Sequence, residues 1–297
     1  MSKRGSVLFA AMCVIWGIPY LLIRIADREL EPPTVVFLRT AIAAVLLLPF
    51  VLRGRQLAWV RDRWRVLVLY TAVEVAGPWG LLTWAERHLT SSLAGLIIAA
   101  VPLLGVLVNR LAGSHEQVDR RRMIGLLVGV AGVVLLVGLQ IGELDMLAVG
   151  AVLLTALGYA TGPIILSRTM ADLPATAVVA ASLVLTALVY APWAAASWPA
   201  HVSGEVIAAV VVLAVVCTAV AFLIFFALIR EVGPTRATVI TYVNPAVALL
   251  LGVVILGEPF TLGMALGFPL VIVGSILSTG SVRPAPAPAG LDLVTDS

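Results

Sequence analysis

Residues 5–23 of the chain read GSVLFAAMCVIWGIPYLLI, and no charged residue interrupts them between Arg4 and Arg24. A helix needs roughly 20 apolar residues to cross about 30 Å of hydrocarbon, because each residue advances it by about 1.5 Å. About ten such stretches follow one another through the 297 residues, and the stretch from 66 to 85 is broken only by Glu74. Backbone groups inside lipid find no water to bond, so these stretches are expected to be helices. The sequence therefore predicts an all-α integral membrane protein with ten transmembrane helices.

The composition of the chain is that of a membrane protein. Hydrophobic residues make up 61% and charged residues 12%, which is about half the charge of a soluble domain. The net charge of +3 indicates no nucleic-acid partner. Cys13 and Cys217 both lie inside apolar stretches, so we expect small buried residues there, without a disulfide or a metal site.

The distribution of basic residues predicts the orientation in the membrane. With the amino terminus inside the cell, all 19 basic residues except Arg24, Arg28, Arg39 and Arg87 fall on the inner side. Short loops rich in lysine and arginine stay on the cytoplasmic side of a membrane. We therefore expect a multi-pass protein of the plasma membrane with both termini in the cytoplasm.

The two halves of the chain align with a shift of about 143 residues. Pro102 then falls on Pro245 and, one residue of slippage later, Glu116 falls on Glu258. Each half contains five stretches, and five is odd, so the second half is expected to enter the membrane from the opposite face. Inverted repeats with interrupted helices are the architecture of secondary transporters, whose substrate site lies near the midplane between the repeats.

The predicted boundaries follow from this repeat. Residues 1–142 form the first five-helix repeat and residues 143–280 the second, while residues 281–297 are expected to be a disordered cytoplasmic tail. The basic run at 120–122 and the counterpart loop around residue 258 are expected on opposite membrane surfaces.

Several short motifs resemble the EamA-type transporters of the drug/metabolite transporter superfamily. They are Ile15-Trp16-Gly17-Ile18-Pro19-Tyr20, then Phe37-Leu38-Arg39-Thr40-Ala41, and then the pair Gly257-Glu258 followed by Gly267 and Gly274. The order and spacing of these motifs over residues 7–280 carry the resemblance. The first half departs from the pattern, with Ser114-His115-Glu116 in place of a Gly-Glu pair.

The resemblance implies ten helices around a central cavity, and transport of small metabolites such as amino acids. It does not identify the substrate. We expect a secondary transporter that works as an exporter, with proton coupling as a hypothesis. The small-molecule substrate and the lipid bilayer are the expected partners, and no cofactor is expected.

Glu74 and Arg39 are the charges that lie deepest in the apolar stretches. Counting from the helix ends, Glu74 lies about 14 Å from the inner end and Arg39 about 8 Å below the outer end. Charges at membrane depth usually face a cavity or a partner. We hypothesise that Glu74 binds a cationic group or a coupling proton, and that Arg39 balances it or binds an anionic group. The alternatives are a static ion pair, or an Arg39 that reaches to the outer headgroups.

Polar and aromatic residues at helical spacing complete the predicted substrate site. Besides Arg39 and Glu74, it comprises Trp16, Tyr20, Tyr70, Tyr159, Ser182, Thr241 and Asn244. Such groups around an apolar cavity suit small amphipathic solutes. The alternative for each hydroxyl is a hydrogen bond between helices, worth under about 1 kcal/mol.

Three prolines and two glycine pairs predict how the helices bend and pack. Pro78, Pro102 and Pro245 interrupt the hydrogen bonds inside their stretches, which makes them candidate hinges or, alternatively, static kinks. The pairs Gly125-x-x-x-Gly129 and Gly263-x-x-x-Gly267 allow close helix approach in lipid. They predict a contact between helices or between the two copies of a homodimer.

Two other classes of membrane protein are alternatives to a transporter. An intramembrane enzyme needs a nucleophile, paired acids or histidines at depth, whereas His88, His115 and His201 all lie in connections and have no metal-ligand spacing. A structural or sensory membrane protein predicts no solute flux.

Overall fold

The computed structural model describes residues 2–53, 60–112, 120–138, 144–233, 237 and 239–279. All regular structure within these ranges is helical. The α-helices of the first half are α1 (Lys3–Ile15), α2 (Pro19–Ala26), α3 (Pro32–Arg53), α5 (Trp64–Tyr70), α6 (Gly77–Ala85), α7 (Ser91–Ile98), α8 (Val101–Leu111) and α9 (Arg120–Gly138). Those of the second half are α10 (Met146–Thr169), α11 (Ala175–Ala196), α12 (Gly204–Ala214), α13 (Ala221–Val232), α15 (Ile240–Ile255) and α16 (Leu262–Thr279). Two π-helical turns are η1 (Thr71–Ala76) and η2 (Val215–Val220).

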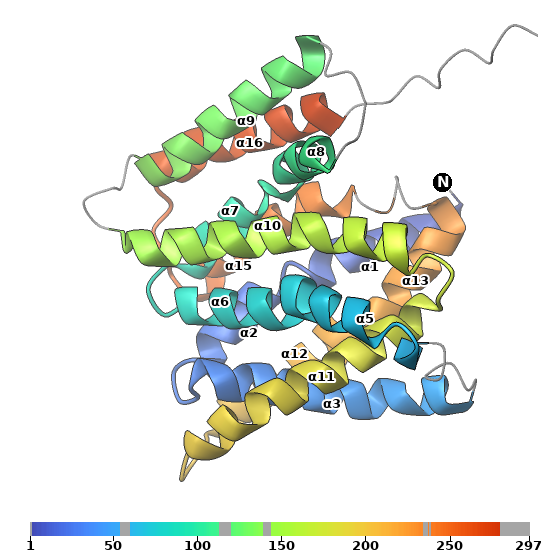
Figure 1. Cartoon of the computed structure of the whole chain (residues 1–297). Coiled ribbons are helices and arrows are strands. Elements are labelled where there is room, and N and C mark those ends of the chain that lie inside the picture. Colours follow the sequence, from blue (N-terminus) through green and yellow to red (C-terminus); the bar gives the residue numbers. More distant parts are fainter. Residues whose placement is uncertain are drawn as a thin grey trace, which may run out of the picture.

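Most of these helices join into segments that are long enough to cross a membrane. In the described ranges eight segments combine sufficient length with sufficient hydropathy, and Ile240–Ile255 and Leu262–Ser278 are shorter apolar helices. Figure 1 shows the long segments side by side, with their ends gathered at two opposite sides of the bundle. We call the side where α1 begins the N-terminal end, and the side where α2 ends the far end.

Two segments are broken into two α-helices close to a proline. The break between α1 and α2 lies at residues 16–18, before Pro19, and the break between α7 and α8 lies at Ala99 and Ala100, before Pro102. Proline has no N–H to donate, and the first turn of a helix is where that group is not needed. The second helix of each pair therefore has its proline in the first turn, at the first residue of α2 and at the second residue of α8.

Two other segments contain a wide π-helical turn instead. The turn η1 joins α5 to α6, and η2 joins α12 to α13. A π turn leaves backbone carbonyls without their usual partner, and here side chains supply one. The Tyr190 hydroxyl donates to Ala76 O at 2.9 Å, and the Thr218 hydroxyl donates to Leu213 O at 2.9 Å. The repeat shift of about 143 residues brings the first turn to within one residue of the second.

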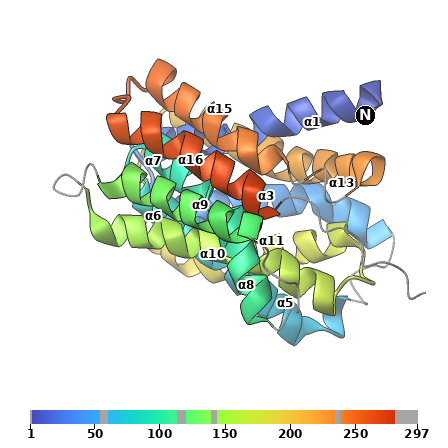
Figure 2. The ribbon, with the colours of Figure 1, turned by 90° about the horizontal axis from the view of Figure 1, so that it is seen from above.

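Helices from the two halves pack against each other throughout the bundle. The pairs in contact include α3 with α11, α6 with α10, α7 with α15, α2 with α12 and α1 with α13. Figure 2 shows α9 lying along α16. A Cβ added at Gly125 would meet Gly274 O at 2.8 Å, and one at Gly267 would meet Gly132 O at 2.7 Å. The glycine motifs therefore serve as a contact between two helices of one chain.

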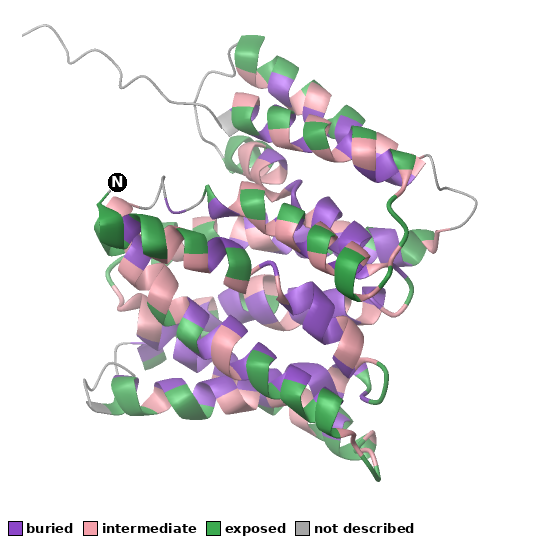
Figure 3. Ribbon diagram, turned by 180° about the vertical axis from the view of Figure 1, so that it is seen from behind, coloured by how far each residue is buried: buried purple, intermediate pink, exposed green. Residues whose placement is uncertain are grey.

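The core lies inside the bundle and apolar side chains cover its outside. Figure 3 shows buried residues gathered in the middle and exposed residues on the outer faces. Exposed Leu127, Val130 and Val134 lie on one face of α9. An apolar outer face is what a lipid environment favours, because lipid tails do not penalise it.

Candidate functional site

Arg39 is buried where the two halves of the chain meet. It lies on α3 with 7% of its surface exposed. Its Nε donates to the Thr218 hydroxyl of η2 at 2.9 Å, and its guanidinium carbon lies 3.6 Å from the ring centroid of Trp79 on α6. A cation over an indole face is stabilised by the ring electrons. Arg39 therefore joins α3, α6 and η2, and does not extend to the headgroups.

Glu74 lies in the π turn η1 against α10. Its Oε2 is buried and has no hydrogen-bond partner. Gly162 of α10 makes room for the carboxylate, because a Cβ added there would lie 2.6 Å from Glu74 Cδ. Gly158, one turn earlier, faces the same stretch, since its added Cβ would meet Pro78 Cγ at 2.7 Å. The two glycines thus let α10 approach the π turn closely.

Tyr159 of α10 lies between the two charges. It interacts electrostatically with both Arg39 and Glu74, and its hydroxyl faces Trp79. Within the described part of the chain, no ion pair joins Arg39 to Glu74. The static ion pair considered above is therefore not the arrangement in this structure.

Trp16 and Asn244 belong to a neighbouring cluster between α1, α13 and α15. The Trp16 ring lies 4.7 Å from Phe225 and 6.0 Å from Phe222, measured between centroids. Asn244, with its amide oriented to satisfy both polar atoms, donates from its nitrogen to Cys13 O and to Ile240 O at 3.0 Å. These bonds give Asn244 a packing role in this conformation.

The other predicted site residues are divided between two buried clusters. Tyr20 packs in the largest apolar cluster, beside Gly95 of α7. Tyr70 and Trp79 belong to the second cluster, and Tyr159 packs against that cluster. Ser182 is fully buried and donates to Val178 O of its own helix at 2.8 Å. Thr241 lies on α15, partly buried. The structure thus gathers Arg39, Glu74, Tyr70 and Tyr159, with Tyr20 close to Arg39 and Tyr159. Asn244 and Trp16 lie in the neighbouring cluster.

The predicted hinges occupy two kinds of position. Pro78 follows η1 in the first turn of α6, and Pro102 lies in the first turn of α8, after the break in its segment. Pro245 lies inside α15 and is buried. The first two therefore coincide with interruptions of the helix, as expected of residues that allow bending.

The far end holds buried acids that the sequence reasoning missed. Glu86 caps the C-terminus of α6 with 0% of its surface exposed, and neither of its carboxylate oxygens has a hydrogen-bond partner. Burial raises the pKa of Glu86 well above its ordinary value. Nearby Asp27 and Glu258 raise that pKa further, while Arg24 and Arg39 lower it. Glu86 was overlooked because it ends its apolar stretch, where a charge ordinarily meets water.

Asp27 lies beside Glu86 at the C-terminus of α2. Both of its carboxylate oxygens are buried without a hydrogen-bond partner. Burial raises the pKa of Asp27 to about 7, while Arg87 and Arg24 lower it and Glu31 raises it. The sequence signal was weak, since an acid beyond a helix end is common and gives no hint of burial.

Glu258 of the Gly257-Glu258 pair holds the start of α7. Its carboxylate accepts from Ser91 N at 2.7 Å, Ser92 N at 2.8 Å and the Ser92 hydroxyl at 2.5 Å. A carboxylate at a helix N-terminus satisfies donors that the helix leaves free. Gly257 has a φ of 66°, a conformation that glycine adopts without strain. Glu116, its counterpart in the first half, lies outside the described residues.

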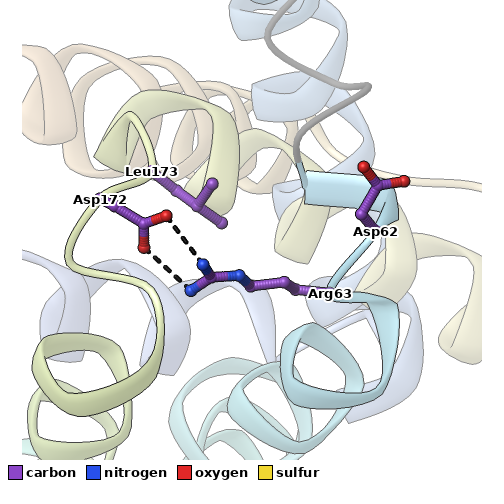
Figure 4. Close-up of a pocket in the computed structure, with 4 residues that line it drawn as sticks. All are labelled: Asp62, Arg63, Asp172 and Leu173. Atoms are coloured by element: carbon purple, nitrogen blue, oxygen red, sulfur yellow. Dashed lines mark hydrogen bonds and ion pairs between the residues drawn. The ribbon is translucent and has the colours of Figure 1, made fainter.

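The N-terminal end carries an ion pair between the two halves. Figure 4 shows Arg63, just before α5, pointing at Asp172 in the connection between α10 and α11. Its Nη1 and Nη2 lie 2.9 and 2.8 Å from the two carboxylate oxygens, a bidentate geometry. Asp62 points away from this pair and, with Leu173, completes the lining of a cavity of about 400 Å³.

Two cavities lie at opposite ends of the bundle. The far-end cavity measures about 620 Å³ and its lining, like that of the N-terminal cavity, includes neither Arg39 nor Glu74. The central charges therefore line neither of these two cavities. In the ranges described, no group of three His, Cys, Asp or Glu side chains is arranged to hold a metal ion.

Comparison with known proteins identifies relatives over nearly the whole chain. A family model described as the EamA-like transporter family matches residues 3–138 and again residues 146–280. An Escherichia coli K12 protein described as the uncharacterized inner membrane transporter YedA is 30% identical over 277 residues, covering 91% of this chain and 88% of that protein. An uncharacterized transporter of Archaeoglobus fulgidus is 25% identical over 277 residues, covering 90% and 96%.

A solved structure shares the fold. A protein of known crystal structure superimposes with a TM-score of 0.67 at 22% identity, over 94% of this chain and 97% of that chain.

Proposed function

This chain belongs to the EamA-like transporter family, and from that premise we propose that it is a secondary transporter exporting small metabolites. That the chain is a membrane transporter rests on its family and on the names of its relatives. Small amphipathic metabolites such as amino acids are the proposed cargo, and the plasma membrane is the proposed location.

The proposed architecture is ten membrane crossings in two inverted repeats. The family model matches the chain twice, over 3–138 and 146–280. The two π turns fall at equivalent places under the repeat shift, and helices of the two halves pack in pairs across the bundle. We further propose that the N-terminal end, where basic residues gather, faces the cytoplasm.

The proposed site is the group formed by Arg39, Glu74, Tyr70 and Tyr159. The observation that carries it is Glu74, whose Oε2 is buried at membrane depth without a hydrogen-bond partner. An unpaired acid inside a membrane span is costly to keep, which favours a functional reason for it. In the proposal Glu74 alternately holds a proton and the cationic group of the cargo, and Arg39 binds an anionic group.

Access to this group requires a conformational change. The two end cavities do not include the central charges in their linings, so neither of them leads to the site in this conformation. Rocking of one repeat against the other would open it to each end in turn. The bidentate Arg63–Asp172 pair would have to break for the N-terminal end to open, and Pro78, Pro102 and Pro245 are the proposed hinges.

Transport by purified protein in liposomes tests the proposal. Metabolites that accumulate outside cells overproducing the protein, and not outside cells lacking it, supply the candidates. Each is then loaded into liposomes with and without an imposed pH gradient. We expect flux that depends on the protein and follows the gradient. Absence of flux for every candidate would favour a structural or sensory membrane protein, and chemical conversion would favour an enzyme.

Cysteine labelling tests the orientation separately. Cys13 and Cys217 are replaced by alanine, and single cysteines are introduced as Arg121→Cys and Pro259→Cys. In intact cells, we expect an impermeant maleimide to label position 259 and to leave 121 unlabelled. Labelling of both positions, or of neither, contradicts the inverted repeat.

A further inference from the structure

The far-end cavity of about 620 Å³ is lined almost entirely by charged side chains. The lining consists of Arg24, Asp27, Arg28, Arg87, Thr90, Leu256 and Glu258. Charged groups on a cavity wall ordinarily neutralise one another, so the informative ones are those that have no partner.

Three of the five lining charges are already paired. Arg28 Nη1 lies 2.9 Å from Glu205 Oε1. Arg87 contacts Glu31 Oε2 at 2.7 Å and donates to Leu30 O at 2.7 Å. Glu258 accepts the donors at the start of α7. Arg28 and Glu258 therefore have little left to offer a ligand, and Arg87 keeps only its buried Nε without a partner.

The remaining two charges are Arg24 and Asp27, which interact electrostatically with each other. Neither forms an ion pair with a described residue. Arg24 Nη1 donates at 2.5 Å to Glu86 O, which is a neutral carbonyl. Both carboxylate oxygens of Asp27 are covered by protein atoms and have no hydrogen-bond partner, so the side chain has to turn toward the cavity before a ligand can reach it. Arg24 and Asp27 are three residues apart at the end of α2, so they lie on the same side of that helix.

We infer that this cavity is a second binding site, in which Arg24 holds the carboxylate and Asp27 the ammonium group of a small zwitterion. The inference rests on the proposed function, in which the far end is the outer face of the membrane and the side on which cargo leaves the protein. The Thr90 hydroxyl, which accepts from Leu93 N at 3.2 Å, keeps its own hydrogen to donate. Leu256 gives the rest of the solute an apolar surface.

The charge balance favours a zwitterion over a simple ion. A cation bound at Asp27 alone would leave Arg24 unpaired beside it, and an anion bound at Arg24 alone would leave Asp27 unpaired. The buried residue Glu86 holds Arg24 in place, because its backbone carbonyl accepts a hydrogen bond from the guanidinium group. Asp27 faces Arg87, Arg24 and Glu31, and burial raises its pKa to about 7. An ammonium group against its carboxylate would favour the ionised form.

Calorimetric titration of the detergent-solubilised protein tests the site. The probes are L-leucine, its decarboxylated amine 3-methylbutylamine, and its deaminated acid 4-methylpentanoate, each at millimolar concentration. We expect leucine to bind and both single-charge analogues to bind at least about tenfold more weakly, the loss expected for one charged hydrogen-bond partner. Equal binding of one analogue would overturn the inference, and so would no binding of leucine.

Matched variants tie the binding to the two residues. Arg24→Gln and Asp27→Asn are each expected to weaken leucine binding at least about tenfold, whereas Arg28→Gln, in the same cavity but already paired, is expected to leave it unchanged. Thermal unfolding of each variant checks that it is folded. Unchanged leucine affinity in the folded Arg24 and Asp27 variants would also overturn the inference.

The inference and the proposed function fail in different ways. Leucine binding without any protein-dependent flux would contradict the transporter and leave the cavity site standing. Protein-dependent flux without leucine binding would contradict the cavity site alone.

Discussion

The two halves of this chain share a backbone device and differ in the charges placed around it. Each half has a π turn in an equivalent segment. Among the described residues, every buried polar side-chain atom without a hydrogen-bond partner belongs to the first half: Asp27, Thr71, Glu74, Glu86, Arg87 and Ser91. The buried polar residues of the second half are serines and threonines with hydrogen-bond partners, such as Ser182, Thr186 and Thr218.

The features that both halves share are the ones that the fold requires. The charges found in one half alone are therefore candidates for a functional role. Where Glu74 lies in the first half, the repeat alignment places Cys217 in the second, and where Arg39 lies it places Ser182. The fold is therefore built without these charges in one of its two copies. Unsatisfied buried charges cost stability, so their presence in the other copy favours a role in transport.

The largest effect is expected from removing the central acid. Glu74→Gln should reduce flux driven by a pH gradient about a hundredfold or more, because the amide cannot exchange a proton. The measurement is gradient-driven flux in liposomes. Cys217→Ala, at the equivalent position, is the matched control and should keep nearly full flux. Equal losses in both variants would mean that the π turn matters and the acid does not.

A smaller loss is expected from changing the central base. Arg39→Gln removes the charge, its stacking on Trp79 and its bond to Thr218, and should reduce flux at saturating cargo about tenfold to a hundredfold. Arg39→Lys keeps the charge without the planar stacking and should recover part of the flux.

The counterpart change provides the comparison for Arg39. Ser182→Ala removes only a hydroxyl that bonds its own helix, so flux should change less than about twofold. If Ser182→Ala lost as much flux as Arg39→Gln, the asymmetry between the halves would not be functional.

Replacing the glycine that makes room for Glu74 should lower the stability of the folded protein. Gly162→Ala brings a Cβ within 2.6 Å of Glu74 Cδ and should cost about 1–3 kcal/mol through overpacking. Gly150→Ala in the same helix meets nothing within 4 Å and is the control. The unfolding midpoints in detergent should differ by several degrees. The double variant Gly162→Ala with Glu74→Ala removes the contact with the carboxylate but keeps Glu74 Cβ at 2.7 Å. It should therefore regain part of the loss, and that part ties the clash to this carboxylate.

The smallest effect concerns the acids of the far end. Asp27 has its pKa raised to about 7, so the folded state binds more protons than the unfolded state between about pH 4 and 7. Stability should therefore fall as pH rises through this window, by about 1 kcal/mol for a partly exposed group. Asp27→Asn should flatten part of that dependence in thermal unfolding. An unchanged pH profile would show that Asp27 is solvated.

The sequence predicted much of the central site and little of the far end. Arg39 and Glu74 were recognisable because a charge inside an apolar stretch stands out by itself. Glu86 and Asp27 lie at the ends of stretches, where charges normally meet water. Their burial comes from packing that joins distant residues, with Glu258 holding the start of α7 beside them. Ser182 and Asn244 were expected at the substrate, and in this structure they bond backbone carbonyls.

The amino-acid sequence by itself determined that the chain is helical and membrane-bound, because long uncharged stretches leave no other way to satisfy the backbone in lipid. It also indicated the repeat, through matched prolines and glutamates. Which charges are paired was decided only by the tertiary structure. Arg39 meets Trp79 and Thr218, while Glu74 stays unpaired beside Gly162. Pairing depends on distances of a few ångströms between helices, and the order of residues along a chain does not contain them.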